Sequence, residues 1–440
     1  MRWENTMDAL RMKSDRHKLL HKNGILMILF FTLLMLLLQG CGKSVDKTQM
    51  TDDESIKKNI PLTSSENLKK YEPLPVLSDV VYDFASYESV ISTDTTKMSE
   101  TRAVKGVYVS GHAAGISSWM DDLVHLADTT EINAFVIDVK NDSGHITYDM
   151  DLEEVKEVGA NNKAIRDIEA LMERLYVHDI YPIARIVAFK DPFLAERKPE
   201  YAIKNKDGSL WKYKNTPWLD PYNKDAWKYI VDVSKEAAKI GFKEIQFDYI
   251  RFEATGSLAE ADFQGKEALQ TREEVILEFL EYAMEELKPY GVKVSADVFG
   301  TVITSSKDAA TIGQDYVEMS KVVDVICPMI YPSHYGFGFY NTPKGEHSDL
   351  YPYRIIYGSM MDSADKLSQI PEGDHKAIVR PWLQAFTASY LGRGNYKTYD
   401  AAAIREQIQA TYDAGLEEWI LWHAGVKYNP AGLLPIGQDE

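Results

Sequence analysis

The sequence is poor in cysteine, with 2 among 440 residues, and its 26 glycines and 17 prolines show no excess and no period. Two cysteines cannot form a disulfide framework, and a collagen-like or low-complexity chain is excluded by the glycine and proline contents. Basic residues are also in the minority, because 49 Lys and Arg stand against 67 Asp and Glu, a formal charge of −18. Such a field repels phosphate backbones, so we expect no nucleic-acid partner.

Apolar side chains, in contrast, are abundant. Hydrophobic residues make up 45% of the chain and aromatic residues 11%, which is the composition of a folded protein. A chain of this length can bury a core without cross-links. The length allows one large domain or two to three ordinary ones.

The N-terminus is predicted to be a lipoprotein signal peptide. Basic residues are followed by an uncharged apolar run from Gly24 to Leu38, which is shorter than the roughly 20 residues that span a bilayer. This order is typical of a secretory signal. The string Leu38-Gln39-Gly40-Cys41 resembles a bacterial lipobox, so we expect Cys41 to carry lipids and to anchor the protein to the cell membrane, outside the cytoplasm. An uncleaved anchor with an incidental cysteine is the alternative.

The segment after the signal peptide is rich in Ser, Thr, Asp, Glu and Lys. This composition predicts a solvated, flexible tether, although its middle, around residues 76–84, is apolar enough to dock on a domain surface. We therefore predict a signal peptide over residues 1–40, a polar tether over 41–101 and a folded domain over 102–440.

Eight short apolar runs, rich in Val, Ile, Phe and Tyr, recur through the domain. Such near-continuous apolar runs are typical of parallel strands that are buried on both faces. The runs are Val104–Gly111, Ala134–Asn141, Tyr181–Phe189, Glu244–Phe252, Lys293–Gly300, Val323–Pro332, Ala377–Phe386 and Glu418–Gly425.

Helical patterns lie between these runs. Residues 226–240 place their apolar side chains on one stripe, Thr271 and Glu274 form a capping-box signature, and residues 401–414 end at Gly415. The alternation predicts an α/β fold, a (β/α)8 TIM barrel. Residues 190–223 and 333–367 are its expected insertions. A doubly wound sheet is disfavoured, because no Gly-rich phosphate loop follows the first strand.

Charged residues interrupt several of the predicted strands. A charge near the end of a buried strand is costly unless it is paired or used. Because side chains alternate along a strand, Asp248 and Asp297 are predicted to point into the barrel from adjacent strands. Further inward or rim polar groups are expected at Asp138, Lys140, Arg185, Arg380 and His423.

Two carboxylates at one barrel mouth are what glycoside hydrolysis requires, because one protonates the leaving oxygen while the other attacks the anomeric carbon or activates water. We predict that Asp248 and Asp297 are this pair. The alternative is that each aspartate only forms a salt bridge, Asp248 with Arg251 or Arg185, and Asp138 with Lys140.

Aromatic residues crowd the predicted loops, and their flat faces suit the C–H faces of pyranose rings. Packing of the loops by these rings is the alternative. We expect Trp211 and Trp218 to lie on a mobile cover that contacts ligand. The predicted substrate-binding set is Asp138, Lys140, Arg185, Trp211, Trp218, Arg251, Tyr331, Trp382, Gln384, Trp422 and His423.

Other chemistries have weak support. The histidines His112, His334 and His423 lack a metal-binding spacing, so no metal and no cofactor is expected. Cys327 lies mid-strand and is predicted to be a small buried residue. No G-x-S-x-G nucleophile elbow exists.

Seven segments resemble the bacterial DUF4015 family of glycosyl-hydrolase-like barrel domains. They are Val104–Tyr108, Ala134–Lys140, Trp218–Tyr222, Gly241–Phe252, Val294–Gly300, Pro328–Pro332 and Arg380–Phe386. The resemblance implies a TIM barrel remotely similar to the α-amylase-like hydrolases, whose nucleophile is an Asp at the end of strand 4, the position of Asp248. Those enzymes have an acid Glu after strand 5, where this chain has Asp297. The acid/base assignment therefore stays open, with Glu253 as the substitute.

Two functions follow from these patterns. The first is a surface-anchored glycoside hydrolase that acts on a polysaccharide or a cell-envelope glycan. The second is a catalytically silent barrel that binds glycan as an envelope interaction module. Both explain the aromatic residues, and only the first needs two unpaired carboxylates in one cleft.

Overall fold

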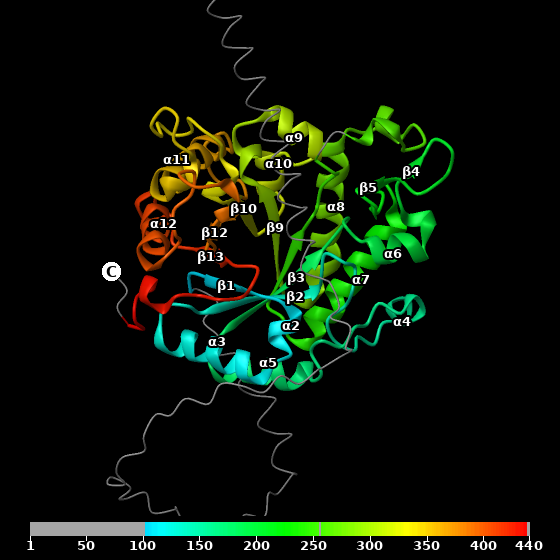
Figure 1. Ribbon diagram of the computed structural model, residues 1–440. Coiled ribbons are helices and arrows are strands. Elements are labelled where there is room, and N and C mark those ends of the chain that lie inside the picture. The colour runs from blue at the N-terminus through cyan, green and yellow to red at the C-terminus, as the bar shows by residue number, and fades with distance from the viewer. Residues whose placement is uncertain (1–101, 255–256, 438–440) are drawn as a thin grey trace, which may run out of the picture. The chain divides into compact units, whose positions relative to one another are not determined.

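The computed structural model describes residues 102–254 and 257–437 (Figure 1). The predicted signal peptide, the lipidation site Cys41 and the tether over residues 41–101 lie outside the described residues. Within the two described ranges, no helix combines the length and the apolarity that a membrane span requires.

The domain is a closed barrel of parallel strands, which confirms the predicted (β/α)8 fold. Its strands are β1 (Lys105–Val109), β2 (Ala134–Lys140), β3 (Tyr181–Val187), β7 (Glu244–Asp248), β9 (Lys293–Phe299), β10 (Val325–Ile330), β11 (Ile378–Val379), β12 (Trp382–Gln384) and β13 (Trp419–Trp422). β11 and β12 are two halves of the seventh strand, since both pair with β10 and Pro381, which lacks an amide hydrogen, stands between them. Pairing of β1 with β13 closes the barrel.

Helices surround the barrel and cover the outer face of its strands (Figure 1). In chain order they are α2 (Gly111–Ala114), α3 (Ser117–Thr129), α4 (Glu153–Val158), α5 (Ile168–Val177), α6 (Pro192–Arg197), α7 (Lys224–Ile240), α8 (Arg272–Leu287), α9 (Ser306–Ile312), α10 (Tyr316–Ser320), α11 (Pro352–Leu367) and α12 (Ala401–Asp413). Short 3₁₀ turns join several of them.

Local sequence signals fix the helix ends. The predicted capping box opens α8, because the Glu274 amide donates to Thr271 Oγ1 at 3.2 Å and the Thr271 amide donates to Glu274 Oε2 at 2.7 Å. Asn223 caps the start of α7, and Gly241 ends that helix at φ +119°, a conformation that favours glycine. The helix predicted over residues 401–414 is α12, one residue shorter.

The period-two alternation of the strands separates two apolar layers. Outward-facing side chains join the helices in one large cluster, as Phe247 does against Phe279 of α8, with ring centroids 5.4 Å apart. Inward-facing side chains form a second cluster inside the barrel, which comprises Val104, Ala134, Val136, Ile183, Val325, Cys327, Tyr331, Trp382 and Ile420. Asp248 and Asp297 share the inward phase, as the alternation predicted.

The floor of the barrel, at the starts of the strands, is a buried ion cluster. Arg380 Nη1 lies 2.7 Å from Glu244 Oε1, and Arg380 Nε lies 2.6 Å from Glu418 Oε2. Glu244 opens β7 and Glu418 directly precedes β13, so the Arg380 guanidinium that contacts both lies at the N-terminal end of the barrel, although Arg380 itself stands between β11 and β12. The sequence predicted Arg380 among the inward or rim polar groups. Arg380 does face inward, but its guanidinium lies at the N-terminal end of the barrel, opposite the loops that follow the strands.

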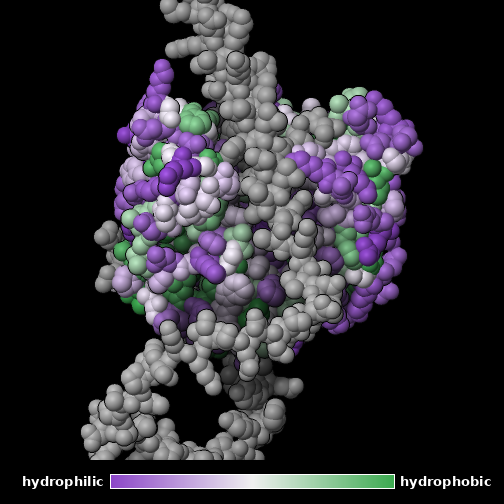
Figure 2. All heavy atoms as spheres, viewed as in Figure 1, coloured by the Kyte–Doolittle hydropathy of each residue, from purple (hydrophilic) through white to green (hydrophobic). Residues whose placement is uncertain are grey.

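The two expected insertions differ in nature. Residues 190–223 form a true excursion that contains α6 and the small strands β4 (Lys204–Asn205), β5 (Lys212–Tyr213) and β6 (Thr216–Pro217). β4 pairs with β8 (Ala261–Asp262) from the loop after β7, which joins the two loops. Mainly hydrophilic residues cover this part of the surface (Figure 2). The second stretch is only half insertion, because its latter part is α11, the helix that belongs to the sixth strand.

Candidate active site

The candidate site lies at the carboxyl ends of the barrel strands, where active sites of this fold occur. Tyr108 comes from β1, Asp138 from β2, Arg185 from β3, Asp248 from β7 and Asp297 from β9. Asp138 and Arg185 are direct cross-strand partners. The paired register of β7 and β9 ends at Phe247 and Ala296. Asp248 and Asp297 are the next residues of these two strands, so they lie at the same level along the barrel.

Asp248 is held by a charged partner on one oxygen and a backbone amide on the other. Arg185 donates to Asp248 Oδ2 from Nε at 3.0 Å and from Nη2 at 2.6 Å. The Tyr249 amide donates to Oδ1 at 2.6 Å. The carboxylate is therefore oriented and has an ionic partner, as the salt-bridge alternative expected for Arg185. Arg251, the other expected partner, donates to its neighbour's carbonyl at Phe252.

The backbone turns sharply directly after Asp248. Tyr249 has φ +53°, a left-handed conformation that costs a residue other than glycine about 1–3 kcal/mol. This turn aims the Tyr249 amide at the Asp248 carboxylate, and the Tyr249 ring lies 4.6 Å from Lys190 Nζ. Strain of this kind concentrates at functional sites, because the surrounding structure must hold it in place.

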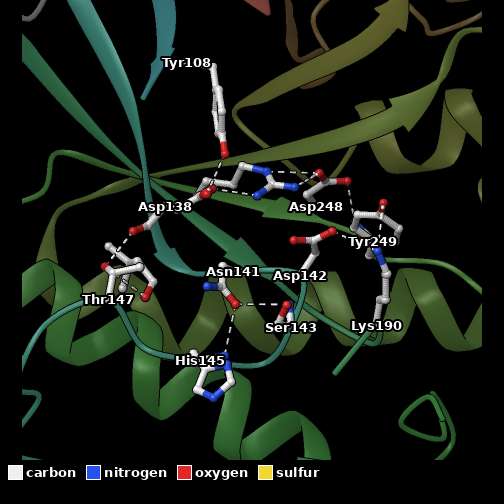
Figure 3. A network of polar contacts seen from close by, with 12 residues as sticks. Tyr108, Asp138, Asn141, Asp142, Ser143, His145, Thr147, Lys190, Asp248 and Tyr249 are labelled. Atoms are coloured by element: carbon white, nitrogen blue, oxygen red, sulfur yellow. Dashed lines mark hydrogen bonds and ion pairs between the residues drawn. The ribbon is translucent and has the colours of Figure 1, made fainter. Parts of the chain in front are cut away.

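Asp138 lies next to the same guanidinium (Figure 3). The Tyr108 hydroxyl donates to Asp138 Oδ2 at 2.6 Å, and Arg185 Nη1 donates to Oδ1 at 2.6 Å. Burial raises the pKa of Asp138 above its ordinary value, although Arg185 and the Tyr108 hydroxyl oppose that rise. The partner of Asp138 is thus Arg185, and the expected pair of Asp138 with Lys140 does not form.

Asp297 occupies a different environment from Asp248. Its side chain is buried, and Trp382 Nε1 donates to Oδ1 at 2.7 Å. Burial raises the pKa of Asp297 well above its ordinary value, and the negative charge of Asp248 raises it further. The two neighbouring carboxyl groups therefore lie in unlike environments, Asp248 in an ion pair with Arg185 and Asp297 buried with a raised pKa. Unlike environments of this kind divide acid and base roles in hydrolases.

Aromatic side chains line the barrel next to these carboxyl groups. The Tyr331 ring lies 5.8 Å from the Trp422 ring, and Trp422 lies 6.3 Å from Tyr108. Burial raises the pKa of Tyr331 strongly, and the charges of Asp297 and Asp248 add to that rise. Three predicted aromatic residues, Tyr331, Trp382 and Trp422, are thus brought together with the carboxyl pair.

Two predicted binding residues instead serve the protein interior. Lys140 is fully buried, with Nζ 2.8 Å from Asp191 Oδ2 and 2.6 Å from the Val187 carbonyl, because the register of β2 shifts between Asp138 and Lys140. The Gln384 amide nitrogen donates to Asp349 and to the Phe386 carbonyl, while its oxygen accepts from the Ser333 amide. Both side chains are fully buried, and their polar atoms bond to the protein.

The two tryptophans of the long loop are also buried. Trp211 is 3% exposed and Trp218 is 4% exposed, which favours the packing alternative over contact with ligand. Arg251, 4% exposed, lies 5.1 Å from the Trp218 ring centroid and 4.5 Å from that of Phe299. Burial lowers the pKa of Arg251.

The remaining predicted residues lie at the edge of the site. Glu253 is buried and carries its charge close to Arg251. His423 lies just past the end of β13 and accepts a hydrogen bond from the Gly425 amide at Nδ1, 2.9 Å away. Burial, followed by the charge of Lys427, lowers the pKa of His423.

The sequence reasoning missed four residues of this network, namely Tyr108, Asp142, Lys190 and Tyr249 (Figure 3). Lys190 Nζ lies 2.9 Å from Asp142 Oδ2 and 3.4 Å from the Tyr249 hydroxyl. Partial burial raises the pKa of Asp142, but Lys190 and Arg185 outweigh it and hold that pKa below its ordinary value. Asp142 lies two residues past the end of β2, and a polar turn at that point was the available signal.

Within the described ranges, no group of three or more His, Cys, Asp or Glu side chains is placed to hold a metal ion. The polar groups at the barrel mouth are carboxyl groups, a guanidinium, an ammonium and phenol groups. These groups can donate and accept protons and can bind hydroxyl-rich ligands.

A closed (β/α)8 barrel with paired carboxyl groups and aromatic rings at its carboxyl mouth defines the class of glycosyl-hydrolase-like barrels. The chain belongs to the DUF4015 family, described as "Putative glycosyl hydrolase domain", whose model matches residues 106–428. This confirms the resemblance found in the sequence. None of the curated proteins matches the chain.

Several solved structures are similar. A hypothetical protein from Ruminiclostridium thermocellum is 40% identical and covers 44% of this chain and 97% of its own, with a TM-score of 0.41. The PgaB (BpsB) glycoside hydrolase domain from Bordetella bronchiseptica is 13% identical and covers 74% and 95%, with a TM-score of 0.54. The glycoside hydrolase domain of PelA from Pseudomonas aeruginosa is 10% identical and covers 77% and 99%, with a TM-score of 0.41. The PgaB domain supports the fold.

Proposed function

We propose that the protein is a glycoside hydrolase that cleaves a polysaccharide or a cell-envelope glycan through Asp248 and Asp297. One observation carries the proposal: two carboxyl groups on adjacent strands have opposite environments. Asp248 is ion-paired with Arg185, whereas Asp297 is buried and its pKa is raised. Membership of a glycosyl-hydrolase-like family adds support.

In this mechanism Asp297 is the general acid. Its proton moves to the glycosidic oxygen as the bond from that oxygen to the anomeric carbon breaks. A proton donor must remain protonated at the working pH, and the raised pKa of Asp297 meets that requirement. Since the Trp382 indole donates to Oδ1, the transferable proton of Asp297 is assigned in this mechanism to Oδ2.

Asp248 is the nucleophile in the proposed mechanism. Carboxyl groups about 5–5.5 Å apart give retention of configuration, and groups about 6.5–9.5 Å apart give inversion. Neighbouring strands lie about 4.8 Å apart, and the two aspartates leave adjacent strands at the same level, which favours retention. Asp248 then forms an ester with the anomeric carbon. Water, deprotonated by Asp297, breaks that ester and restores both groups.

We assign the acid role to Asp297 and not to Glu253. Asp297 lies close enough to Asp248 for the two charges to interact, whereas Glu253 interacts with the charge of Arg251. Tyr331 and Trp422 supply aromatic surface at the same place, which suits a sugar ring. The substrate class that this arrangement supports is therefore carbohydrate.

A silent glycan-binding barrel is the competing function, and the Arg185–Asp248 ion pair is the observation that favours it. An ion-paired aspartate satisfies a structural role without catalysis. In the hydrolase the same pair has a different task, because it keeps the nucleophile ionised beside a protonated acid.

The decisive experiment is a screen of the purified full chain against a glycan panel that detects released reducing ends. Release by the wild type, lost in Asp248→Asn and kept in the matched surface variant Asp121→Asn, supports the hydrolase. Asp121 pairs with Arg174 on the outer helices and is largely exposed. Glycan binding without any release by the wild type supports the silent barrel.

We also propose that the protein is extracytoplasmic and held to the cell membrane by lipids on Cys41. The support is the lipobox-like string after a short apolar run. A tether of about 60 residues would let the barrel reach glycans at a distance from the membrane.

A further inference from the structure

We propose that Tyr108 and Asp138 are positioning residues that fix the Arg185 guanidinium so that it holds Asp248 in place. This inference rests on the proposed function, because it gives a task to the groups that stand behind the nucleophile. It changes the role expected from the sequence, in which Asp138 and Arg185 were substrate contacts.

The three groups form one continuous chain of charge-assisted hydrogen bonds (Figure 3). The Tyr108 hydroxyl and Arg185 Nη1 each donate to a different oxygen of Asp138, both at 2.6 Å. The remaining guanidinium edge donates twice to Asp248 Oδ2. Asp138 is 5% exposed and both of its oxygens accept from the protein, so it supports Arg185 and offers little to a ligand.

The members of this chain are themselves fixed. Asp138 and Arg185 are cross-strand partners in the β2–β3 register. The carbonyl of Tyr108 accepts a hydrogen bond from the Tyr428 hydroxyl at 2.6 Å, and the Arg185 guanidinium lies 5.8 Å from the Tyr108 ring centroid. A site carried by strands and supported by outer hydrogen bonds holds its geometry more tightly than a site on loops.

The charges give the arrangement a measurable consequence. One guanidinium charge of Arg185 is shared between the carboxylates Asp138 and Asp248. The other groups that face these carboxylates are Asp297, Tyr331, Arg251 and, on the Asp138 side, Asp142 with its partner Lys190. Removal of the Asp138 charge leaves Arg185 without its second ionic partner, so the guanidinium loses one of the two contacts that orient it toward Asp248.

The test is the measurement of kcat and KM for the full chain carrying Asp138→Asn. This change keeps the volume and an acceptor for the Tyr108 hydroxyl but removes the charge. The readout is the split between kcat and KM, because a group that only positions the nucleophile does not contact the sugar. The value of kcat should fall while KM stays close to that of the wild type, because the guanidinium loses its anchor. Tyr108→Phe should lower kcat less, again at constant KM.

A matched control exists on the surface. The Tyr353 hydroxyl donates to Asp413 Oδ2 at 2.6 Å, on the outer helices α11 and α12, so Tyr353→Phe and Asp413→Asn remove the same chemical groups at a distance. Both should leave kcat and KM unchanged. A raised KM in Asp138→Asn would show that Asp138 touches the sugar, and complete loss of turnover would make it catalytic. Either result overturns the inference and leaves the hydrolase proposal standing.

A second measurement needs no turnover. In protein labelled with ¹³C at aspartate carboxyl carbons, the Asp248 signal is the one that disappears in Asp248→Asn. The position of this signal at a fixed pH should change in Asp138→Asn, because the contacts of Arg185 change, and should stay in place in Asp413→Asn. An unmoved signal refutes the positioning role even if the wild type cleaves no glycan. In that case the hydrolase proposal fails on its own evidence.

Discussion

Replacement of Asp297 by Asn tests the division of roles most directly. The change removes the transferable proton but keeps the volume and an oxygen that can accept from the Trp382 indole, which now donates at 2.7 Å. If Asp297 is the general acid, the variant should fold and bind glycan while turnover falls. A positioned acid contributes about 10²–10⁴-fold to the rate, which corresponds to about 3–5 kcal/mol of barrier at 1.36 kcal/mol per factor of ten.

The loss should depend on the leaving group. A glycoside whose leaving group is a good one, such as a nitrophenol, needs little protonation, so Asp297→Asn should slow it least. A natural sugar leaving group needs full protonation and should show the whole loss. Initial rates on both substrates, with wild type and variant side by side, give the comparison. An equal loss on both substrates would refute the acid role, and full activity on both would refute any catalytic role.

The pH dependence of the activity is an independent test of the acid role of Asp297. Burial and the charge of Asp248 raise the pKa of Asp297, so the wild type should lose activity as pH rises through that raised pKa, when the acid deprotonates. Asp297→Asn has no such proton and should lack this alkaline limb. An alkaline limb that persists in the variant would assign it to another group.

The same raised pKa has a consequence for stability. The folded state binds this proton more tightly than the unfolded state, so the stabilisation is fully present below the unfolded pKa and is lost as pH rises through the folded pKa. Asp297→Asn should remove this loss. Thermal unfolding of the variant should therefore depend less on pH than that of the wild type in this window, and an identical dependence would contradict the protonation state that we assign.

Three further predictions follow from the structure and the sequence. Asp248→Asn should reduce kcat by at least about 10³-fold with little effect on glycan binding, and turnover close to that of the wild type would remove Asp248 from the mechanism. Trp211→Ala should lower the free energy of unfolding by about 3 kcal/mol, because the ring is 3% exposed, and a loss of glycan affinity without a fall in melting temperature would instead favour ligand contact. Cys41→Ala should abolish lipid processing and release the protein from membranes on fractionation, whereas equal retention without processing would favour an uncleaved anchor.

Much of the fold could be predicted because burial on both faces of a barrel strand leaves a distinct pattern. All eight apolar runs contain a strand of the barrel. The period of two then placed Asp248 and Asp297 on the inner face from the sequence alone. The same rule placed Asp138 correctly, since its oxygens meet Arg185 inside the barrel.

Other features depend on contacts that no local pattern encodes. The shift of register after Asp138 turned Lys140 toward Asp191, and alternation alone predicts the opposite. Gln384 found its partners in loops distant in sequence, such as Asp349. A count of aromatic residues could not distinguish rings that pack a loop, as Trp211 does, from rings that line the barrel, as Trp422 does. Tertiary neighbours decide each of these cases.

The ion cluster on the barrel floor bears on how the chain acquires its fold. Arg380 and Glu244 are 136 positions apart in the chain, and a buried carboxylate that lacks its cation costs about 3–5 kcal/mol. A nascent or truncated chain that ends before Arg380 therefore holds an uncompensated charge at the centre of an unfinished sheet, with the open strand edges that invite aggregation and proteolysis. Closure pairs β1 with β13, so the edge of β1 is covered only once the last strand of the barrel has been synthesised. If the chain is exported unfolded, as the proposed signal peptide implies, folding after that strand has emerged avoids this vulnerable intermediate.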